Sequence, residues 1–442
     1  MPVYKDLDDL AGCIFGKEYQ VESEVAKDTK GLGSTQLRFK ITPIDKNVGN
    51  QDSQQVFAKQ NDMESQVYKL LHVVEKESIM YDRIIPCVIK FLSERDSQLC
   101  SDVRLLFPHY YGRGSVSNNH IFLFQDLFHA HGEKFKVNAS DTFHDEAHVH
   151  LVMASLAKFH GVFHAMKNIG GFDFKDEYPI LAEDYLLEQT SFDLVAPFYN
   201  GEFHKAWEIL QVVLHCYSSK CFNMVKSKLV LPDNHVYNIQ KALEKLKFLV
   251  GDPLQLMKKI RQRENADTSI LIHGDFHPMN IAMSDSKIKF FDYQLIRYSD
   301  GLSDVNQYLC QGTTPQQRSK NLTSYLETYH KTLTETCKIL GMSGSPYGDT
   351  AGFMLEYRKF SPLQIPYGFG MLIWKFVTDF KVYEELANLL KELECCTASD
   401  KSIPHENIIT CIDKLGPKIW VAIQILFEFV IEIEDNGILD QI

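Results

Sequence analysis

The chain of 442 residues has no excess of positive charge, which limits the partners that a broad surface could attract. Its 46 Lys and Arg face 58 Asp and Glu, so the formal net charge is −12. A general nucleic-acid-binding protein carries a basic face that pairs with phosphates, and we therefore expect no nucleic acid among the partners. The balance still permits a local basic pocket for a phosphate group.

The chain also lacks long apolar runs and the features of a secreted protein. Its first 20 residues have acidic side chains where a secretory signal has Lys or Arg, and they contain no apolar stretch. The segment from Ile419 to Ile433 is interrupted by Gln424, Glu428 and Glu432, which predicts a core helix and no membrane span. The ten cysteines include no Cys-x-x-Cys pair, which favours reduced thiols. We therefore expect a cytoplasmic protein.

Strand-like alternation is concentrated in the first 127 residues. The candidate strands are Tyr19–Asp28, Ser34–Thr42, Gln54–Lys59, Asp102–Phe107 and His120–Phe124. Glycine and polar residues separate the first three strands. A helical segment from about Asp62 to Glu94, interrupted near Pro86, lies between the third strand and the fourth. These elements predict a small β-rich lobe at residues 1–127.

Residues 128–442 are mostly helical, with one strand-rich island from Ser269 to Tyr293. Apolar residues recur at helical spacing in Ala147–Lys167, Tyr185–Ala196, Phe203–Val225, Ser319–Leu340 and Phe376–Leu393. We therefore predict an α+β fold with two lobes. The chain crosses near residues 125–130 from the small β-rich lobe to a larger, mostly helical lobe.

The island contains the side chains that phosphoryl transfer requires. An apolar strand leads into His273-Gly274-Asp275, Asn280 follows five residues after Asp275, and a predicted β-hairpin then ends at Asp292. In phosphoryl transfer one carboxylate orients the attacking hydroxyl and accepts its proton, while an Asn and a second carboxylate hold Mg²⁺ against the nucleotide phosphates. Asp275 fits the first role, and Asn280 and Asp292 fit the metal roles. The alternative is an Asp and an Asn that only form Asx turns.

The small lobe offers groups for the nucleotide phosphates. Lys59 lies on an apolar-flanked strand, where it can contact phosphates, and a Glu on the following helix can hold that Lys in place. Glu77 is preferred for this role because Ile84-Ile85-Pro86 follows it, and Glu64 is the rival.

Gly31, Gly33 and Ser34 lie between two predicted strands, as the residues of a loop that covers phosphates do. Backbone N–H groups in such a loop can contact phosphate directly. An ordinary glycine hairpin would produce the same pattern, so this segment indicates a nucleotide contact only in combination with the island.

The segments HGDFHPMN and FFDYQ resemble the catalytic loop and metal motif of the aminoglycoside phosphotransferase and choline kinase-like superfamily. Within it, the chain is most similar to the ecdysteroid kinase-like family. The resemblance extends over most of the chain, through Phe57–Gln60, the Glu77–Pro86 segment, Phe122–Leu127, Leu156–His160 and Gly301–Asp304. It implies a bilobal protein-kinase-like fold, ATP and Mg²⁺ as cofactors, and an Asp304 that braces the catalytic loop.

The resemblance also implies that Phe122–Leu127 is the hinge, with Gln125 and Leu127 beside the nucleotide. The sequence departs from the family at His277, where a Trp is usual, at Tyr293, where a Phe is usual, and at Gln125, where a Glu is frequent. None of these departures removes a catalytic group. They bear on which subfamily the chain resembles, and therefore on which substrate the resemblance implies.

We expect an ATP-dependent kinase whose partners are a nucleotide and a small-molecule hydroxyl acceptor. The resemblance implies an ecdysteroid or a related lipophilic compound as the acceptor. Choline, an aminosugar, or a xenobiotic glycoside or phenol is the alternative within the same class. A pseudokinase or nucleotide-binding interaction protein is the alternative from another class, and the presence of Lys59, Asp275, Asn280 and Asp292 together argues against it.

Overall fold

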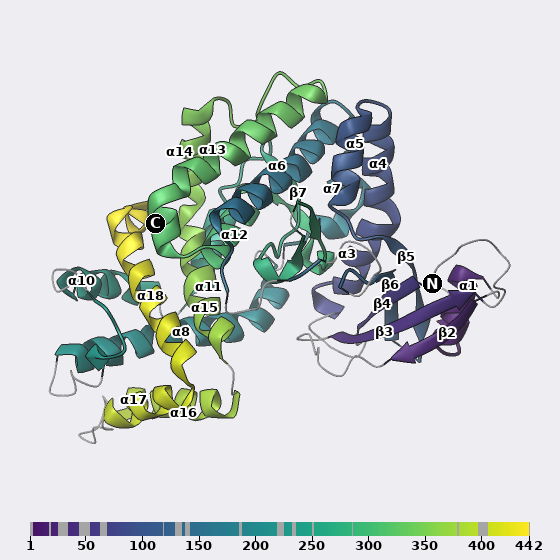
Figure 1. Cartoon of the computed structure of the whole chain (residues 1–442). Helices are drawn as coiled ribbons and strands as arrows, with labels where there is room; N and C mark the ends of the chain where they lie inside the picture. The colour runs from purple at the N-terminus through teal and green to yellow at the C-terminus, as the bar shows by residue number, and fades with distance from the viewer. Residues whose placement is uncertain are drawn as a thin grey trace.

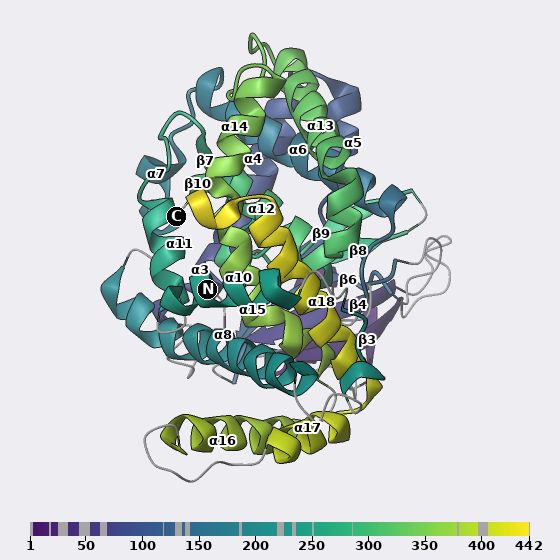
Figure 2. The same cartoon turned by 90° about the vertical axis from the view of Figure 1, so that its left-hand side faces the viewer.

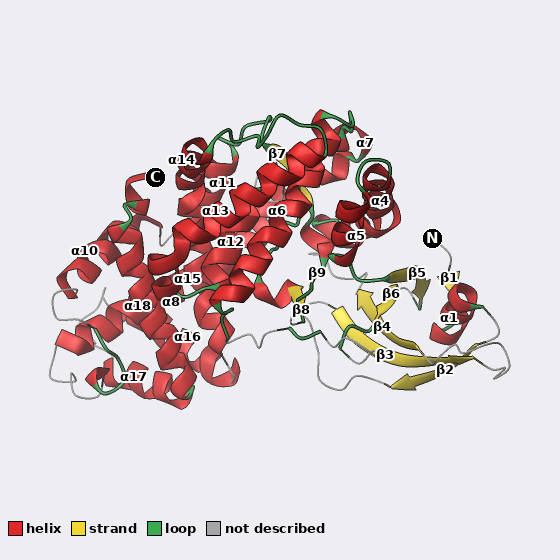
Figure 3. Ribbon diagram, turned by 45° about the horizontal axis from the view of Figure 1, so that its top comes forward, coloured by secondary structure: helices red, strands yellow, loops and turns green. Residues whose placement is uncertain are grey.

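The structure, a computed structural model, has a six-stranded sheet at one end and most of its helices at the other, with two small two-stranded sheets in the helical part (Figures 1 and 3). It describes residues 3–16, 19–24, 34–43, 54–61, 69–117, 119–128, 135–137, 142–184, 188–218, 225–231, 236–249, 252–284, 286–377, 380–396 and 405–441. The predicted α+β class, with a small strand-rich lobe and a larger helical lobe, is confirmed. Within these ranges, no helix combines the length and the apolar character needed to cross a bilayer.

A six-stranded sheet with the order β1-β5-β6-β4-β3-β2 forms the small lobe. Its strands are β1 (Val3–Tyr4), β2 (Tyr19–Glu24), β3 (Ser34–Pro43), β4 (Gln54–Asn61), β5 (Tyr110–Val116) and β6 (Asn119–Gln125). Neighbouring strands are antiparallel except β1 and β5, which are parallel. Four of the predicted strands are therefore confirmed as β2, β3, β4 and β6.

The two faces of the sheet pack against different helices, because successive side chains of a strand point to opposite faces. Helix α1 (Leu7–Phe15) packs on the face that carries Phe39, Val56 and Ile121. Phe122 and Phe124 lie on the other face, in the main hydrophobic core. Lys59, opposite Phe122 in the β4–β6 register, is directed to this second face.

The helical segment after β4 is described from residue 69. It comprises α3 (Val73–Ile79), a π-helical turn (Met80–Ile84) and α4 (Ile85–Ser93) in direct succession. The interruption expected near Pro86 takes the form of this wider turn. Pro86 is the second residue after this turn and has no N–H to donate to the preceding helical residues, which accounts for the interruption.

The strand predicted at Asp102–Phe107 is wrong, because this segment belongs to helix α5 (Ser97–Leu105). Asp96 caps the helix by accepting a hydrogen bond from the Leu99 N–H at 2.6 Å. Leu99 and Val103, four residues apart, are buried on one face. The strand that follows, β5, was not predicted, since Gly112 and a register shift next to it break the alternation of side chains.

The helical lobe is built around α6 and α13, which pack along each other (Figure 1). Its helices are α6 (Glu146–Asn168), α7 (Phe174–Glu177), α8 (Gln189–Ser218), α10 (Val236–Leu246), α11 (Pro253–Arg261), α12 (Leu302–Gly312), α13 (Pro315–Ile339), α14 (Thr350–Phe360), α15 (Gln364–Phe376), α16 (Phe380–Cys396), α17 (His405–Lys414) and α18 (Pro417–Asp435). The helices predicted within α6, α13, α16 and α18 are confirmed. Figure 2 shows α16 and α17 as a separate layer below α8.

Helix α8 replaces two helices that the sequence predicted. The spacing of apolar residues indicated Tyr185–Ala196 and Phe203–Val225 as separate elements. The structure has one helix with Pro197 inside it, packed against α15 and α11, so tertiary packing overrides the local preference. Residues 185–187 and 219–224 lie outside the described ranges.

The strand-rich island is confirmed, with one strand more than predicted. It contains β7 (Ser269–Ile272), β8 (Ile281–Met283) and β9 (Ile288–Phe290), followed by β10 (Arg297–Asp300), which pairs with β7. The segment after β6 is fixed by Asp126, whose carboxylate lies 3.1 Å from the Arg38 Nε and accepts the Phe128 N–H at 2.9 Å. We propose that the lobes divide here, at residue 127.

Candidate active site

The β8–β9 hairpin places Asn280 and Asp292 at the same end of one element. Ile281 lies opposite Phe290 in the antiparallel register, and the Phe291 N–H donates to the Asn280 carbonyl at 3.2 Å. Asn280 directly precedes the first strand and Asp292 follows the second. Two residues that are twelve positions apart in the sequence therefore become neighbours.

Asp275, in the loop between β7 and the hairpin, has polar partners at both carboxylate oxygens. Gln307 Nε2 donates to Oδ1 at 3.0 Å, and Oδ2 lies 3.4 Å from both His277 Nε2 and Asn280 Nδ2. Burial raises the pKa of Asp275, but the charge and hydrogen bond of His277 lower it more, so that this pKa lies well below its usual value. The carboxylate is therefore ionised at neutral pH, as a proton acceptor must be.

His277 is fixed by a second contact. Its Nδ1 accepts the Met279 N–H at 3.2 Å, and its Nε2 lies 3.4 Å from the Asp275 carboxylate. Burial lowers the pKa of His277, and Asp275 raises it more, with a net rise.

Asp304, on α12, holds the start of this loop. Its carboxylate accepts the His273 N–H at 2.8 Å and the Gly274 N–H at 3.0 Å, and His160 Nε2 lies 3.3 Å from it. The contact expected between Asp304 and the loop is therefore present. His273 contacts the backbone, since its Nε2 lies 3.0 Å from the Phe291 carbonyl oxygen.

Gly274 allows the chain to turn where no side chain fits. Its φ is +82°, and a Cβ atom there would lie 2.0 Å from the Leu295 carbonyl oxygen. The buried Arg297 donates to the Gly274 carbonyl at 2.7 Å. Sequence reasoning did not identify Arg297, and its only signal was a basic residue within the apolar run after Asp292.

Lys59 joins the sheet, helix α3 and the hairpin. Its Nζ lies 2.8 Å from Glu77 Oε2 and 2.5 Å from Asp292 Oδ1. Burial lowers the pKa of Lys59, but Asp292 and Glu77 raise it more, with a net rise that keeps the ammonium charged. Burial also raises the pKa of Glu77, to about 6, against the opposing effect of Lys59. Asp292 has a left-handed backbone, with φ +65°.

The remaining predicted site residues lie partly outside the described ranges. Gly31, Gly33 and the rival Glu64 are not described, and Ser34 is described only as the first residue of β3. Gln125 ends β6, where its N–H donates to the His109 carbonyl at 2.9 Å. Leu127 is buried in a small cluster with Phe135 and Ala282. The roles assigned to these residues stay predictions.

Gln307 is the polar contact of Asp275 that sequence reasoning missed. It lies three residues after Asp304 on α12 and is buried. A single Gln in a helix has no distinctive signal, and only its position one helical turn after Asp304 could have identified it.

The sequence model of the Ecdysteroid kinase-like family matches residues 31–342. A search of curated proteins found no match. Among solved structures, a choline kinase from Cryptosporidium parvum Iowa II aligns with 10% identity over 96% of this chain and 92% of its own, with a TM-score of 0.41.

Two further solved structures align with similarly low scores. An ethanolamine kinase from Plasmodium vivax has 11% identity over 94% of this chain and 85% of its own, with a TM-score of 0.37. An aminoglycoside-3'-phosphotransferase of type VIII has 12% identity over 81% of this chain and 98% of its own, with a TM-score of 0.31. These TM-scores are too low to support an argument about function, whereas the family match covers most of the chain.

Proposed function

The chain belongs to the ecdysteroid kinase-like family, and we propose that it is a kinase that transfers the γ-phosphoryl group of ATP to a hydroxyl of a small molecule. The observation that carries this proposal is the convergence of five groups from distant parts of the sequence. Lys59 contacts Glu77 and Asp292, Asp292 shares a hairpin end with Asn280, and Asn280 contacts Asp275. Phosphoryl transfer uses such a set for positioning and charge stabilisation.

Asn280 and Asp292 suit a divalent cation by their chemistry. The Asn280 amide nitrogen donates to the Asp275 carbonyl at 2.9 Å, which leaves the amide oxygen as the end for a cation. Asp292 contacts Lys59 through Oδ1 and has a second carboxylate oxygen. Amide and carboxylate oxygens are ligands that Mg²⁺ prefers, and Mg²⁺ bound here would neutralise charge on the nucleotide phosphates.

We expect Asn280→Ala and Asp292→Ala each to abolish turnover while the protein stays folded. Each variant removes one proposed oxygen ligand. Turnover with and without EDTA, together with thermal unfolding of each variant, measures this. Full activity in EDTA, or in Asp292→Ala, would contradict the metal assignment.

Asp275 is proposed to orient the acceptor hydroxyl and to take its proton late in the transfer. Its low pKa suits a group that is ionised before the acceptor binds. Lys59 is proposed to contact the nucleotide phosphates, and Glu77 to orient Lys59. The Gly31–Ser34 segment and the hinge residues Gln125 and Leu127 are proposed as further nucleotide contacts.

We propose that the acceptor is a neutral lipophilic hydroxyl compound such as an ecdysteroid. Two features next to Asp275 support a neutral acceptor over choline or an aminosugar. His277 Nε2 lies 3.4 Å from the Asp275 carboxylate and its pKa is raised, so a cationic acceptor at Asp275 would meet a basic group. Met279, in the same loop, has 49% of its surface exposed and offers an apolar contact.

A phosphorylation screen with ATP, read by mass, tests the proposal. The panel contains sterols, phenols, glycosides and amino alcohols. We expect a mass increase of one phosphate on a neutral hydroxyl compound and none on choline. Phosphorylation of the amino alcohols alone would overturn the acceptor class, and no ADP release with any acceptor would favour the pseudokinase alternative.

A further inference from the structure

Gln307 contacts two adjacent residues of the 273–280 loop. Its Nε2 donates to Asp275 Oδ1 at 3.0 Å, and its Oε1 accepts the Phe276 N–H at 3.2 Å. Only 4% of its surface is exposed. One amide group therefore connects the carboxylate of Asp275 with the backbone immediately after it.

The two contacts together require an amide at this position. The Phe276 N–H needs an acceptor, and the Asp275 carboxylate needs a donor. A carboxylate in place of the amide could accept the Phe276 N–H but could not donate to Asp275, and an apolar side chain could make neither contact.

Helix α12 contacts four consecutive residues of the loop through two of its side chains. Asp304 accepts the N–H groups of His273 and Gly274, and Gln307 contacts Asp275 and Phe276. The two side chains are three residues apart and lie on one face of the helix. Asn306 lies between them in the sequence and does not contact the loop through its Oδ1, which accepts from Gln364 Nε2 at 2.9 Å.

We infer that Gln307 is a positioning residue for phosphoryl transfer, which fixes the Asp275 carboxylate so that Oδ2 is presented to the acceptor hydroxyl. The inference rests on the proposed kinase function. Rotation about the last torsion of an Asp side chain is broad and weakly restricted, so the orientation of this carboxylate depends on outside contacts. Small displacements of a reacting group lower the rate of transfer strongly.

Two substitutions separate the two contacts of Gln307. Gln307→Met removes both, and we expect single-turnover transfer to slow by about 10- to 100-fold, the effect of losing a hydrogen bond to a charged group. Nucleotide affinity and the acceptor KM should stay within about twofold of the parent values. Gln307→Glu should slow transfer similarly but keep the Phe276 amide protected from hydrogen exchange, because its carboxylate still accepts that N–H.

Asn306→Ala is the matched control on the same helix. It removes a buried hydrogen bond that does not involve the loop, so we expect lower thermal stability and an unchanged rate of transfer per folded molecule. A purely structural role for Gln307 predicts the same result for Gln307→Met as for this control.

A double-mutant cycle decides whether Gln307 acts through Asp275. In an Asp275→Asn background, Gln307→Met should cause no further loss of rate. A full additional loss there, or a parent rate in Gln307→Met alone, would overturn the inference. If the parent protein phosphorylates no acceptor, the proposed function fails by itself, and hydrogen exchange then tests the contact. Faster exchange of the Phe276 amide in Gln307→Met would support the contact, and unchanged exchange would contradict it.

Discussion

At the scale of single residues, Lys59 contacts groups on both sides of the proposed lobe boundary at residue 127. Its ammonium group contacts carboxylates from α3 and from the segment after β9. We expect Lys59→Met to weaken nucleotide binding by about 10- to 100-fold, because it removes a charged contact to phosphate. The acceptor KM should change much less. Nucleotide titration and acceptor kinetics on the same sample measure both.

Glu77→Gln should affect nucleotide binding less than Lys59→Met does, because the amide oxygen of Gln still accepts a hydrogen bond from Lys59. Glu64→Gln is the control for the rival assignment. A damaging Glu64→Gln combined with a silent Glu77→Gln would show that the wrong Glu was assigned to Lys59.

Asp300, also at the scale of a single residue, makes stability depend on pH. Burial raises its pKa to about 7, although hydrogen bonds from Thr268 and Tyr347 oppose the rise. The folded protein keeps this proton up to about pH 7, whereas an unfolded Asp releases it near pH 4. The contribution to stability is therefore present below about pH 4 and is lost as the pH rises to about 7, by at most about 1.4 kcal/mol per pH unit.

Asp300→Asn should remove this dependence. From pH 5 to pH 8 the free energy of unfolding of the parent should fall by about 2–3 kcal/mol relative to the variant. Denaturant unfolding at both pH values measures the difference. Asp267→Asn, an exposed Asp nearby, should follow the parent. Parallel pH dependences of the parent and Asp300→Asn would contradict the assignment.

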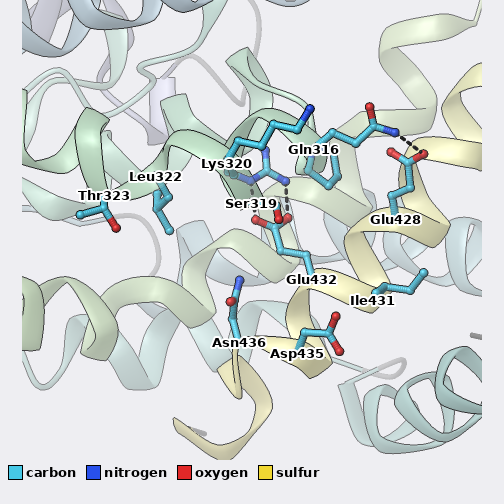
Figure 4. Close-up of a pocket in the computed structure, with 12 residues that line it drawn as sticks. Gln316, Ser319, Lys320, Leu322, Thr323, Glu428, Ile431, Glu432, Asp435 and Asn436 are labelled. Carbon is cyan, nitrogen blue, oxygen red and sulfur yellow. Dashed lines mark hydrogen bonds and ion pairs between the residues drawn. The ribbon is translucent and has the colours of Figure 1, made fainter.

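At the scale of elements, one buried ion pair joins α13 to α18. Arg318 Nε and Nη2 lie 2.8 and 2.6 Å from the two oxygens of Glu432. The pair lies beside a surface pocket of about 430 Å³ between the two helices. In Figure 4, Glu428 and Glu432 project from α18 toward the side chains of α13.

Breaking this pair should destabilise the protein strongly. Glu432→Gln leaves the buried Arg318 charge without its counter-charge, which typically costs about 3–5 kcal/mol. Glu428→Gln, one turn earlier on α18 and paired with Gln316, should cost less than about 1 kcal/mol. Chemical denaturation of both variants compares them. A loss below about 1 kcal/mol in Glu432→Gln would contradict the importance of the pair.

Strands and helices were predicted accurately where a pattern of neighbouring residues defines them, and were missed where it does not. Strands β3, β4 and β6 were predicted nearly to their ends, although β6 is buried on both faces through Ile121 to Phe124. Strand β5 was missed because its register shift next to Gly112 interrupts the alternation. Helix α5 was misread because its last residues, Val103 to Leu105, look like a strand until the Asp96 cap is recognised.

At the scale of the whole molecule, the site was predictable where its residues follow each other in the sequence. Asp275, Asn280 and Asp292 come in order within one island, so their order predicted that they would lie together, and the roles assigned to them stay proposals. Gln307 belongs to a helix with no motif of its own, and only the packing of α12 against the loop brings it to Asp275. The contact between Lys59 and Asp292 spans 233 positions, which is beyond the reach of any local pattern.

We propose that these elements together position one ionised carboxylate, Asp275, beside the acceptor hydroxyl. Asp275→Asn keeps the size of the side chain but cannot take a proton. Single-turnover transfer, nucleotide binding and thermal stability, measured on one sample of this variant, test the claim most directly. We predict a rate lower by about 10²–10⁴-fold, with nucleotide affinity and stability close to those of the parent. A stable variant that binds nucleotide and transfers phosphate at the parent rate would contradict the account.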